Sequence, residues 1–376
     1  MCPVNVQSAD ASAPLPSLYD LTFEQLRNQL NTWGEPAFRA RQIWTWLYQR
    51  MASEIDEMSD LPKSLRSRLR DSVVLSRMSI GAHQRSTDGW TQKWLFHLPD
   101  GAEVETVLME YDGHRRTACI SSQAGCAMNC SFCATGQGGF MRNLRVGEIV
   151  EQVVRVARTL AQAEKSNGKR AEAERLSNLV LMGMGEPFAN YTHVMEAVNR
   201  VMHPEAEGGF GMGARRITVS TVGIVPGIER FTAEDLQVNL AVSLHAATDT
   251  LRDKLVPINI RYPLKSVVHA TRDYVRKTNR RVSYEWALID GVNDTEEQAE
   301  ALVDLVQETN PRSANLVHVN MIPLNPTQGY RGHAPDLEAR HRFREVLDRA
   351  GVPNTLRVRR GIDIAAGCGQ LKAEVG

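Results

Sequence analysis

The sequence has few aromatic residues, few cysteines and no excess of charge of either sign. Aromatic residues make up 6% of the 376 residues, and Lys plus Arg equals Asp plus Glu at 44 each. A formal net charge of zero excludes an undirected polycation, although a local basic face remains compatible with nucleic-acid binding. Hydrophobic residues at 42% and charged residues at 23% are typical of a folded globular protein.

Signals for membrane insertion or export are also missing. No run of about 18 apolar residues occurs, and a helix needs roughly that many to cross a bilayer. Residues 1–16 contain neither Lys nor Arg and no apolar signal-peptide core. Their Ser, Ala and Pro content predicts a disordered leader over residues 1–18. We therefore expect a cytoplasmic protein with reduced thiols and no membrane partner.

Two regions precede the main part of the chain. In residues 19–75, apolar side chains recur at helical spacing behind Thr22, which predicts a helical N-terminal accessory domain for RNA binding. In residues 76–111, short apolar runs stand between Asp-Gly pairs at 88–89, 100–101 and 112–113. Asp-Gly between such runs is typical of hairpin turns, so we expect a β-hairpin region there.

Residues 112–355 alternate apolar runs with amphipathic segments, and residues 356–376 form a tail. Six runs predict strands at 117–121, 179–182, 217–220, 238–244, 282–288 and 316–322. Predicted helices cover 146–161, 193–202, 264–277, 295–308 and 337–350, and the polar segment 162–178 is interpreted as a surface insertion. Crossover helices between strands indicate a parallel sheet. The fold class is therefore α/β, with an open, partial (βα)6 barrel and its site at the C-terminal strand ends.

Three of the six cysteines lie within the segment CAMNCSFC at residues 126–133. A structural zinc site needs four ligands, and no fourth Cys or His follows at the usual spacing. Thiolates from Cys126, Cys130 and Cys133 suit a 4Fe-4S cluster with one iron left open. An aromatic residue before the third cysteine, here Phe132, belongs to the radical S-adenosylmethionine (SAM) pattern. The alternatives are unrelated buried thiols and a zinc site with a remote ligand.

Further motifs follow along the chain: VET at 104–106, Cys119, SSQAGC at 121–126, MGEP at 184–187, SLH at 243–245, IPLNP at 322–326 and AGCGQL at 366–371. In this order and with the cysteine segment, they resemble the motifs of the radical SAM RNA adenine methyltransferases of the RlmN type and the related Cfr type. The resemblance covers roughly residues 20–374. It implies the radical SAM barrel as the core.

The resemblance also implies the reaction, which is methylation of carbon 2 of an adenine in 23S rRNA and of the adenine beside the anticodon in tRNAs. That carbon is electron-poor and has no lone pair to attack a methyl sulfonium, whereas a radical can add to it. The radical is generated by the cofactor, and the protein binds and orients the reactants. The implied cofactors are the 4Fe-4S cluster and two SAM per turnover, with a one-electron donor such as flavodoxin or ferredoxin.

Three residues are catalytic in the implied scheme. Cys368 takes a methyl group from the first SAM, and a 5′-deoxyadenosyl radical from the second removes hydrogen from that methyl. The methylene carbon joins adenine, Glu105 removes the adenine proton, and Cys119 displaces the sulfur in a transient disulfide with Cys368. Without the resemblance, Cys119 is interpreted as a core thiol, Cys368 as an inert exposed thiol and Glu105 as a solvated strand residue.

The SAM contacts are also implied by the resemblance. They are Gly185, Glu186, Ser220, Ser243, Leu244, His245 and Asn325. A Gly-rich turn at 183–187 lets the backbone approach a ligand, and Glu186 can accept a hydrogen bond from the SAM ammonium. Taken alone, this segment is an ordinary βα turn, and His245 is a structural hydrogen-bonding residue.

Basic residues gather in two places, which favours an RNA partner. In residues 63–93, basic residues outnumber acidic ones: Lys63, Arg66, Arg68, Arg70, Arg77, Arg85 and Lys93 stand against Asp71 and Asp88. A second basic patch near Cys368 in the sequence consists of Arg357, Arg359 and Arg360. Solvated helix faces are the alternative for each patch. Two other functions also stay open: Cfr-like methylation of adenine carbon 8, which uses the same machinery, and a non-catalytic iron–sulfur RNA-binding protein.

Overall fold

The computed structural model describes residues 15–166, 175–311 and 314–372. Most of the predicted leader, with Cys2, lies outside the described residues, as does the middle of the predicted insertion at 167–174. The described part of that insertion differs from the expectation, because the preceding helix continues to Ser166 and Leu176 is buried.

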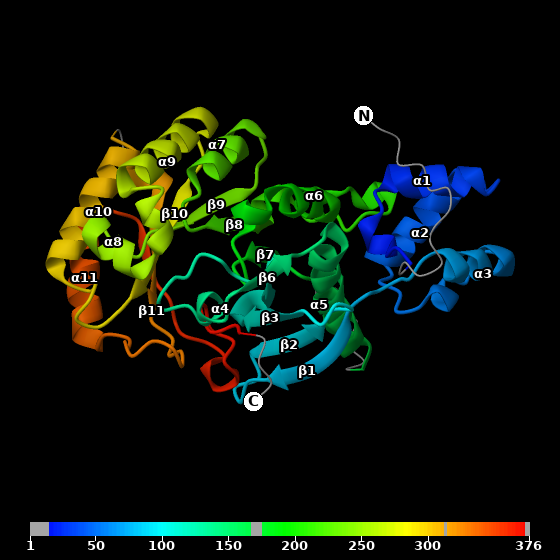
Figure 1. Ribbon diagram of the computed structural model, residues 1–376, viewed down its shortest axis with the longest axis horizontal. Helices are drawn as coiled ribbons and strands as arrows, with labels where there is room; N and C mark the ends of the chain where they lie inside the picture. Colours follow the sequence, from blue (N-terminus) through cyan, green and yellow to red (C-terminus); the bar gives the residue numbers. More distant parts are fainter. Residues whose placement is uncertain (1–14, 167–174, 312–313, 373–376) are drawn as a thin grey trace.

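The N-terminal helices α1 (Phe23–Thr32), α2 (Phe38–Tyr48) and α3 (Lys63–Ser72) stand to one side of the core (Figure 1). Thr22 and Gln25 form a capping box that begins α1. Arg200 attaches this part to the core, since its guanidinium donates to the carbonyls of Tyr19 and Leu21 at 2.7 and 2.6 Å. The helical character expected for residues 19–75 is present.

A ten-stranded mixed sheet runs through the rest of the molecule in the order β1-β2-β3-β4-β7-β8-β9-β10-β11-β12. Strands β1 (Ser79–Arg85), β2 (Thr91–His97) and β3 (Glu103–Tyr111) are antiparallel and continue onto β4 (Arg115–Cys119). From β4 onward all pairs are parallel, through β7 (Asn178–Leu181), β8 (Ile217–Thr221), β9 (Asn239–Ser243), β10 (Val282–Leu288), β11 (Val317–Pro323) and β12 (Asn354–Leu356). The hairpin region therefore extends the sheet of the barrel.

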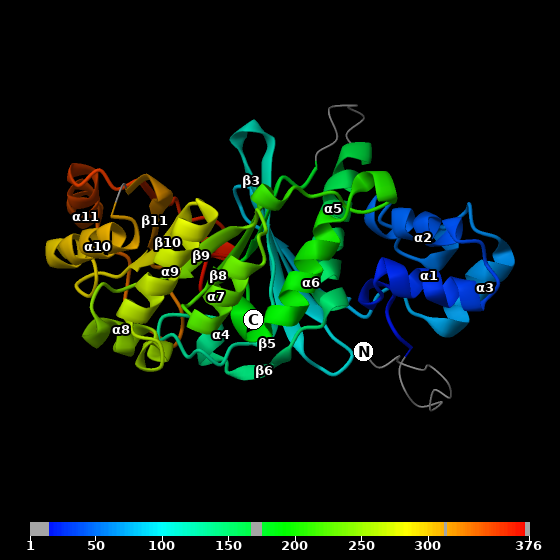
Figure 2. The same ribbon diagram turned by 90° about the horizontal axis from the view of Figure 1, so that it is seen from above.

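Helices cover the outer side of the parallel strands, as Figures 1 and 2 show. They are α5 (Val146–Ser166), α6 (Tyr191–Met202), α7 (Val225–Ala233), α8 (Asp249–Leu255), α9 (Leu264–Thr278), α10 (Glu296–Thr309) and α11 (Leu337–Arg349). All six predicted core strands are present, and they form the open, partial barrel that the sequence predicts. Within the described ranges, no helix is both long and apolar enough for a membrane span.

Candidate active site

The cysteine loop is framed by two short strands and a helical turn, β5 (Gln123–Gly125), α4 (Ala134–Gln137) and β6 (Phe140–Asn143). Gly125 has a φ of +73°, and a Cβ there would lie 2.0 Å from the carbonyl oxygen of Gly139. The same carbonyl accepts a hydrogen bond from the Cys126 amide at 2.7 Å. This close approach requires glycine and fixes the start of the loop.

The three loop thiols interact electrostatically. Burial raises the pKa of Cys126 to about 12 and the pKa of Cys130 well above its usual value, and the nearby Cys133 adds to both shifts. Such thiols become thiolates only beside a compensating positive charge, which a metal cluster supplies. In the described part of the chain, however, no group of three His, Cys, Asp or Glu side chains forms a ready-made metal site. The three thiols nevertheless fit an iron–sulfur cluster, because they are the ligands that such a cluster takes and they lie on one loop.

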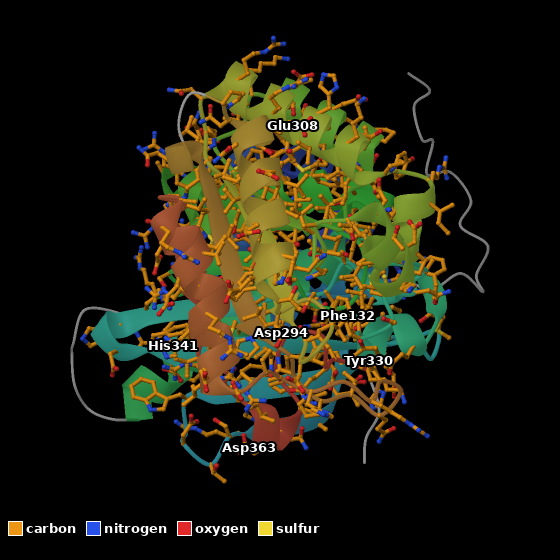
Figure 3. The ribbon with its side chains drawn as sticks, turned by 90° about the vertical axis from the view of Figure 1, so that its left-hand side faces the viewer. Phe132, Asp294, Glu308, Tyr330, His341 and Asp363 are labelled. Carbon is orange, nitrogen blue, oxygen red and sulfur yellow. The ribbon has the colours of Figure 1, made fainter. Side chains whose placement is uncertain are left out.

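A cavity of about 130 Å³, here called the cluster-side cavity, adjoins this loop. Most of the sequence-predicted SAM residues line it, together with two loop cysteines and the thiol of the tail: Cys130, Cys133, Gly185, Glu186, Ser220, Ser243, His245, Asn325 and Cys368. Leu244 differs, because its side chain belongs to the main hydrophobic core. Phe132 and Tyr330 lie close together at the edge of this region, in the small apolar cluster that includes Cys130 (Figure 3).

Glu186 is a buried carboxylate at the end of the Gly-rich turn. Its two oxygens accept the backbone amides of Phe188 at 3.0 Å and Val222 at 2.8 Å, which joins the ends of β7 and β8. Burial nevertheless raises its pKa to about 7. An ammonium group in the cavity would stabilise the ionised carboxylate, so Glu186 is suited to bind a cationic ligand group.

His245 lies just after β9 with a φ of +60°. Its Nδ1 accepts the backbone amide of Ala287 at 2.9 Å, and burial together with Arg252 lowers its pKa to about 3. The ring is therefore neutral at physiological pH and carries its proton on Nε2. It meets Phe132 edge to face at 4.8 Å.

Asn325 connects the cluster-side cavity to the tail. Its Nδ2 donates to the carbonyl oxygen of Cys368 at 3.0 Å, while its buried Oδ1 has no hydrogen-bond partner within the described structure. A buried acceptor without a partner costs free energy, which a ligand donor in the cavity would recover. The residue thus favours a bound polar molecule there.

The tail is fixed on both sides of Cys368. Asp363 accepts the Thr87 amide and hydroxyl at 2.8 and 3.0 Å, beside the antiparallel strands (Figure 3). After Cys368, the carbonyl of Gly369 accepts the Ala134 amide at 2.7 Å, directly behind the cysteine loop. Cys368 is accordingly held against the loop.

Cys368 also lines a second cavity of about 260 Å³, here called the arginine cavity. Its walls include Tyr111, Arg115, Cys119, Arg357, Arg359 and Arg360. Nearby protein atoms raise the pKa of Cys119 and of Cys368 to about 12 each, and Cys368 contributes to the shift at Cys119, although the Cys368 side chain itself is exposed in the open cavity. The two thiols face one cavity, and all five cysteines of the described chain are unbonded.

Glu105 is buried on β3 and lines neither cavity. Its Oε1 lies 2.7 Å from Lys93 Nζ, and its Oε2 accepts the backbone amide of Lys372 at 2.8 Å. The solvated position that its strand alone suggests is therefore wrong. Lys93, counted above in the basic segment, is likewise buried and paired with this carboxylate.

Sequence reasoning missed Arg252, which is fully buried on α8. Its guanidinium donates to the carbonyls of Leu244 at 3.0 Å, Val222 at 2.6 Å and Ser243 at 3.1 Å. It thereby holds together the C-terminal ends of β8 and β9, which line the cluster-side cavity. In sequence it stands between charged residues of a short helix, a pattern that indicates a surface position.

Comparison with known proteins agrees with this geometry. Residues 17–75 match the "Ribosomal RNA large subunit methyltransferase N-terminal domain" family, and residues 120–306 match the radical SAM superfamily. The "Dual-specificity RNA methyltransferase RlmN 1" of Myxococcus xanthus is 47% identical over 98% of this chain and 96% of its own. A "Probable dual-specificity RNA methyltransferase RlmN" of Chloroflexus aurantiacus is 49% identical over 94% and 92%. The chain belongs to the RlmN family.

A solved structure supports the same assignment for this RlmN-family chain. The crystal structure of a radical SAM methyltransferase from Sphaerobacter thermophilus superposes with a TM-score of 0.88 at 47% identity, covering 96% of this chain and 100% of that one. The chain is thus an RNA methyltransferase with a radical SAM fold, and radical SAM membership implies a 4Fe-4S cluster and SAM. The resemblance inferred from motifs is confirmed at the level of the family.

Proposed function

We propose that this RlmN-family protein methylates carbon 2 of an adenine in 23S rRNA and of the adenine next to the anticodon in tRNAs. One observation carries the proposal: Cys368 lies on the walls of both cavities. Two of the loop thiols and most of the SAM residues line one cavity, and Cys119 and the arginines line the other. A thiol in that position can accept a methyl group from SAM in the first cavity and pass its carbon to a base in the second.

The cofactor roles follow from the walls of the cluster-side cavity. Cys126, Cys130 and Cys133 hold the cluster, and Glu186 binds the SAM ammonium. The turn at Gly185, the strand-end residues Ser220, Ser243 and His245, the Leu244 backbone and Asn325 surround the rest of SAM. When bound, the cluster and SAM supply a 5′-deoxyadenosyl radical after one-electron reduction by a donor of the flavodoxin or ferredoxin type.

Cys368 performs the transfer. Its thiol loses a proton and takes a methyl group from one of two SAM molecules used per turnover, which gives S-methylcysteine. The methyl carbon then loses a hydrogen atom and bonds to adenine. The adduct gives up one electron, and Glu105 removes the proton from the adenine carbon. The Cys119 thiolate then attacks the Cys368 sulfur, which breaks the bond between that sulfur and the new carbon. The electron pair of the broken bond stays with the adenine product, which takes up a proton to complete its methyl group, and a transient Cys119–Cys368 disulfide forms in the cavity that the two thiols share.

The substrate assignment agrees with the charge of the arginine cavity. A base that reacts at a thiol on a cavity wall must leave its stack, and cationic walls attract the RNA backbone that carries the base. On α3, Arg66 and Arg70 are partly neutralised by Asp56, so the helical domain at 19–75 contributes a weaker basic face than its sequence suggests. Since rRNA and tRNA are the substrates, we place the protein in the cytoplasm.

Carbon-8 methylation is the second candidate, because it needs the same thiols and cluster. The decisive experiment is nucleoside mass spectrometry of separated 23S rRNA and tRNA from cells with and without this gene. We expect 2-methyladenosine to disappear from both RNAs when the gene is deleted. Loss of 8-methyladenosine instead would assign the Cfr-like reaction, and unchanged nucleosides would assign a non-catalytic binding protein.

A further inference from the structure

A tyrosine and two arginines stand together at the arginine cavity. Tyr111 ends β3 and Arg115 begins β4, and the two are opposite each other in the antiparallel pair. Arg360 comes from the tail that carries Cys368. The Arg115 Cζ lies 3.8 Å from the centroid of the Tyr111 ring, and the Arg360 Cζ lies 4.8 Å from it. Two chain segments far apart in sequence therefore meet over one aromatic ring.

In the part of the chain that the structure describes, the two guanidinium groups have no paired counter-charge. Arginine stays protonated in proteins, so two such groups over one ring repel each other. Asp88 lies within electrostatic range of Arg360, yet within the described residues neither Arg115 nor Arg360 forms an ion pair. Arg142 shows the contrast, since it binds both Asp100 and Glu148. The arrangement is electrostatically incomplete without an anion.

The surrounding walls add to the positive charge. Arg357 Nε donates at 2.9 Å to the amide oxygen of Asn320, which is neutral. Among the described residues, Glu285 is the one carboxylate in the walls of the arginine cavity, and it accepts hydrogen bonds from Ser283 and Asn320. A wider cavity of about 690 Å³ adjoins the first, and it shares Tyr111, Arg115, Arg357 and Arg360 while adding Arg215 and Arg281. A polyanion is the ligand that fits this series of cations.

We infer that Tyr111, Arg115 and Arg360 form a nucleotide clamp: the Tyr111 ring stacks on the adenine that enters the arginine cavity, and the two guanidinium groups bind the neighbouring phosphates. The inference rests on the proposed function and assigns these residues to substrate positioning. Splayed-out bases of RNA stack on aromatic rings and guanidinium planes. The incoming adenine replaces one of the two guanidinium groups on the face of the Tyr111 ring. The displaced guanidinium group then binds a phosphate next to that adenine.

The clamp is testable by RNA binding without chemistry. The probe is an RNA hairpin with 2-aminopurine in place of the target adenine, added to the anaerobic cluster-loaded protein without SAM. Its carbon 2 carries an amino group, so it cannot be methylated there, and its fluorescence is quenched on stacking. We expect wild type and Tyr111→Phe to quench it. Tyr111→Leu should lose most of the quenching and bind roughly 5- to 150-fold more weakly, as for one lost stacked base.

The arginines are tested by salt dependence. Each phosphate contact contributes about 0.7 to 0.9 to the slope of log affinity against log salt. We expect Arg115→Gln and Arg360→Gln each to reduce that slope by about this amount. The matched control is Tyr262 with Arg261, a cation–π pair at 5.4 Å whose residues line neither cavity. Tyr262→Leu and Arg261→Gln should match wild type in quenching and slope.

The possible outcomes separate the clamp from the proposed function. Wild-type quenching by a cluster-loaded Tyr111→Leu, or unchanged salt slopes in both arginine variants, overturns the clamp and leaves the methyltransferase assignment standing. A wild-type protein that binds neither this hairpin nor its adenine counterpart overturns the RNA assignment and the clamp together. Equal losses in the Tyr262 and Tyr111 variants also overturn the clamp, because the effect is then general destabilisation.

Discussion

The backbone amide of Lys372 donates to the Glu105 carboxylate at 2.8 Å, so the end of the tail is bonded to β3. The opposite oxygen of Glu105 contacts Lys93 Nζ at 2.7 Å. Both oxygens of the proposed base are therefore occupied before the substrate arrives. Each oxygen keeps a further lone pair, so Glu105 can still accept the adenine proton once the base reaches it. The tail that presents Cys368 thus also covers Glu105.

Variants of Glu105 and Cys119 should trap a covalent protein–RNA adduct. Both residues act after carbon–carbon bond formation, so without either one the RNA stays bonded through Cys368. Glu105→Gln keeps an oxygen for the Lys372 amide, and Cys119→Ser keeps the size of the side chain, so both should fold and hold iron. The measurement is a denaturing gel after reaction with labelled RNA, SAM and reductant. Cluster-loaded variants that form product normally and trap nothing would return both residues to a structural role.

Cys368 should carry a methyl group when the protein is purified from cells. The Cys368 thiol lines both cavities and is exposed, and Asn325 holds its backbone carbonyl, so the thiol is placed to receive the methyl group. We expect one methylene mass increment on the Cys368 peptide and none on the Cys119 peptide. Cys368→Ala should abolish RNA methylation while keeping iron. Methylation of RNA by that variant would show that the carbon passes by another route.

The cluster should depend on all three loop thiols and on no other cysteine. Anaerobically purified protein should contain about four irons per chain, with each of Cys126→Ala, Cys130→Ala and Cys133→Ala losing most of it. Iron analysis and visible absorbance measure this. Cys2→Ala is the matched control and should keep wild-type iron. Stoichiometric zinc in place of iron would contradict the cluster assignment.

Much of this structure was predictable because its signals are local. The six apolar runs of the barrel lie at their predicted places because buried parallel strands need continuous apolar sequence. Strand β12, only Asn354–Leu356, was missed because three residues carry no such run. Helix α7 was missed because Pro226 and Gly227 lie near its start and conceal its periodicity.

The parts of the site that belong to a sequence motif were predictable. The parts that depend only on contacts between distant segments of the chain were not. The cysteine spacing and the motif around Cys368 led directly to the two thiol groups that the fold brings together. The burial of Lys93 against Glu105 was not predictable, since an alternating strand gives no sign of the tail that covers it. Arg115 and Arg360 meet over Tyr111 through segments far apart in sequence, and no local pattern reveals such a meeting.

His245 should make the folded protein sensitive to mild acid. Its pKa is about 3 in the folded chain and near 6.5 in an unfolded one, so between pH 6.5 and pH 3 the unfolded state binds the proton and the folded state does not. Stability is therefore lost as the pH falls from 6.5 toward 3, and the loss at pH 5 is about 2 kcal/mol.

His245→Asn is the matched variant, because asparagine tolerates the positive φ and its Oδ1 can accept a hydrogen bond from the Ala287 amide. Urea unfolding of the iron-free proteins at pH 7.5 and pH 5 should show the variant gaining about 2 kcal/mol on wild type at the lower pH. Stability curves that stay parallel between the two pH values would mean that His245 is protonated in the folded chain.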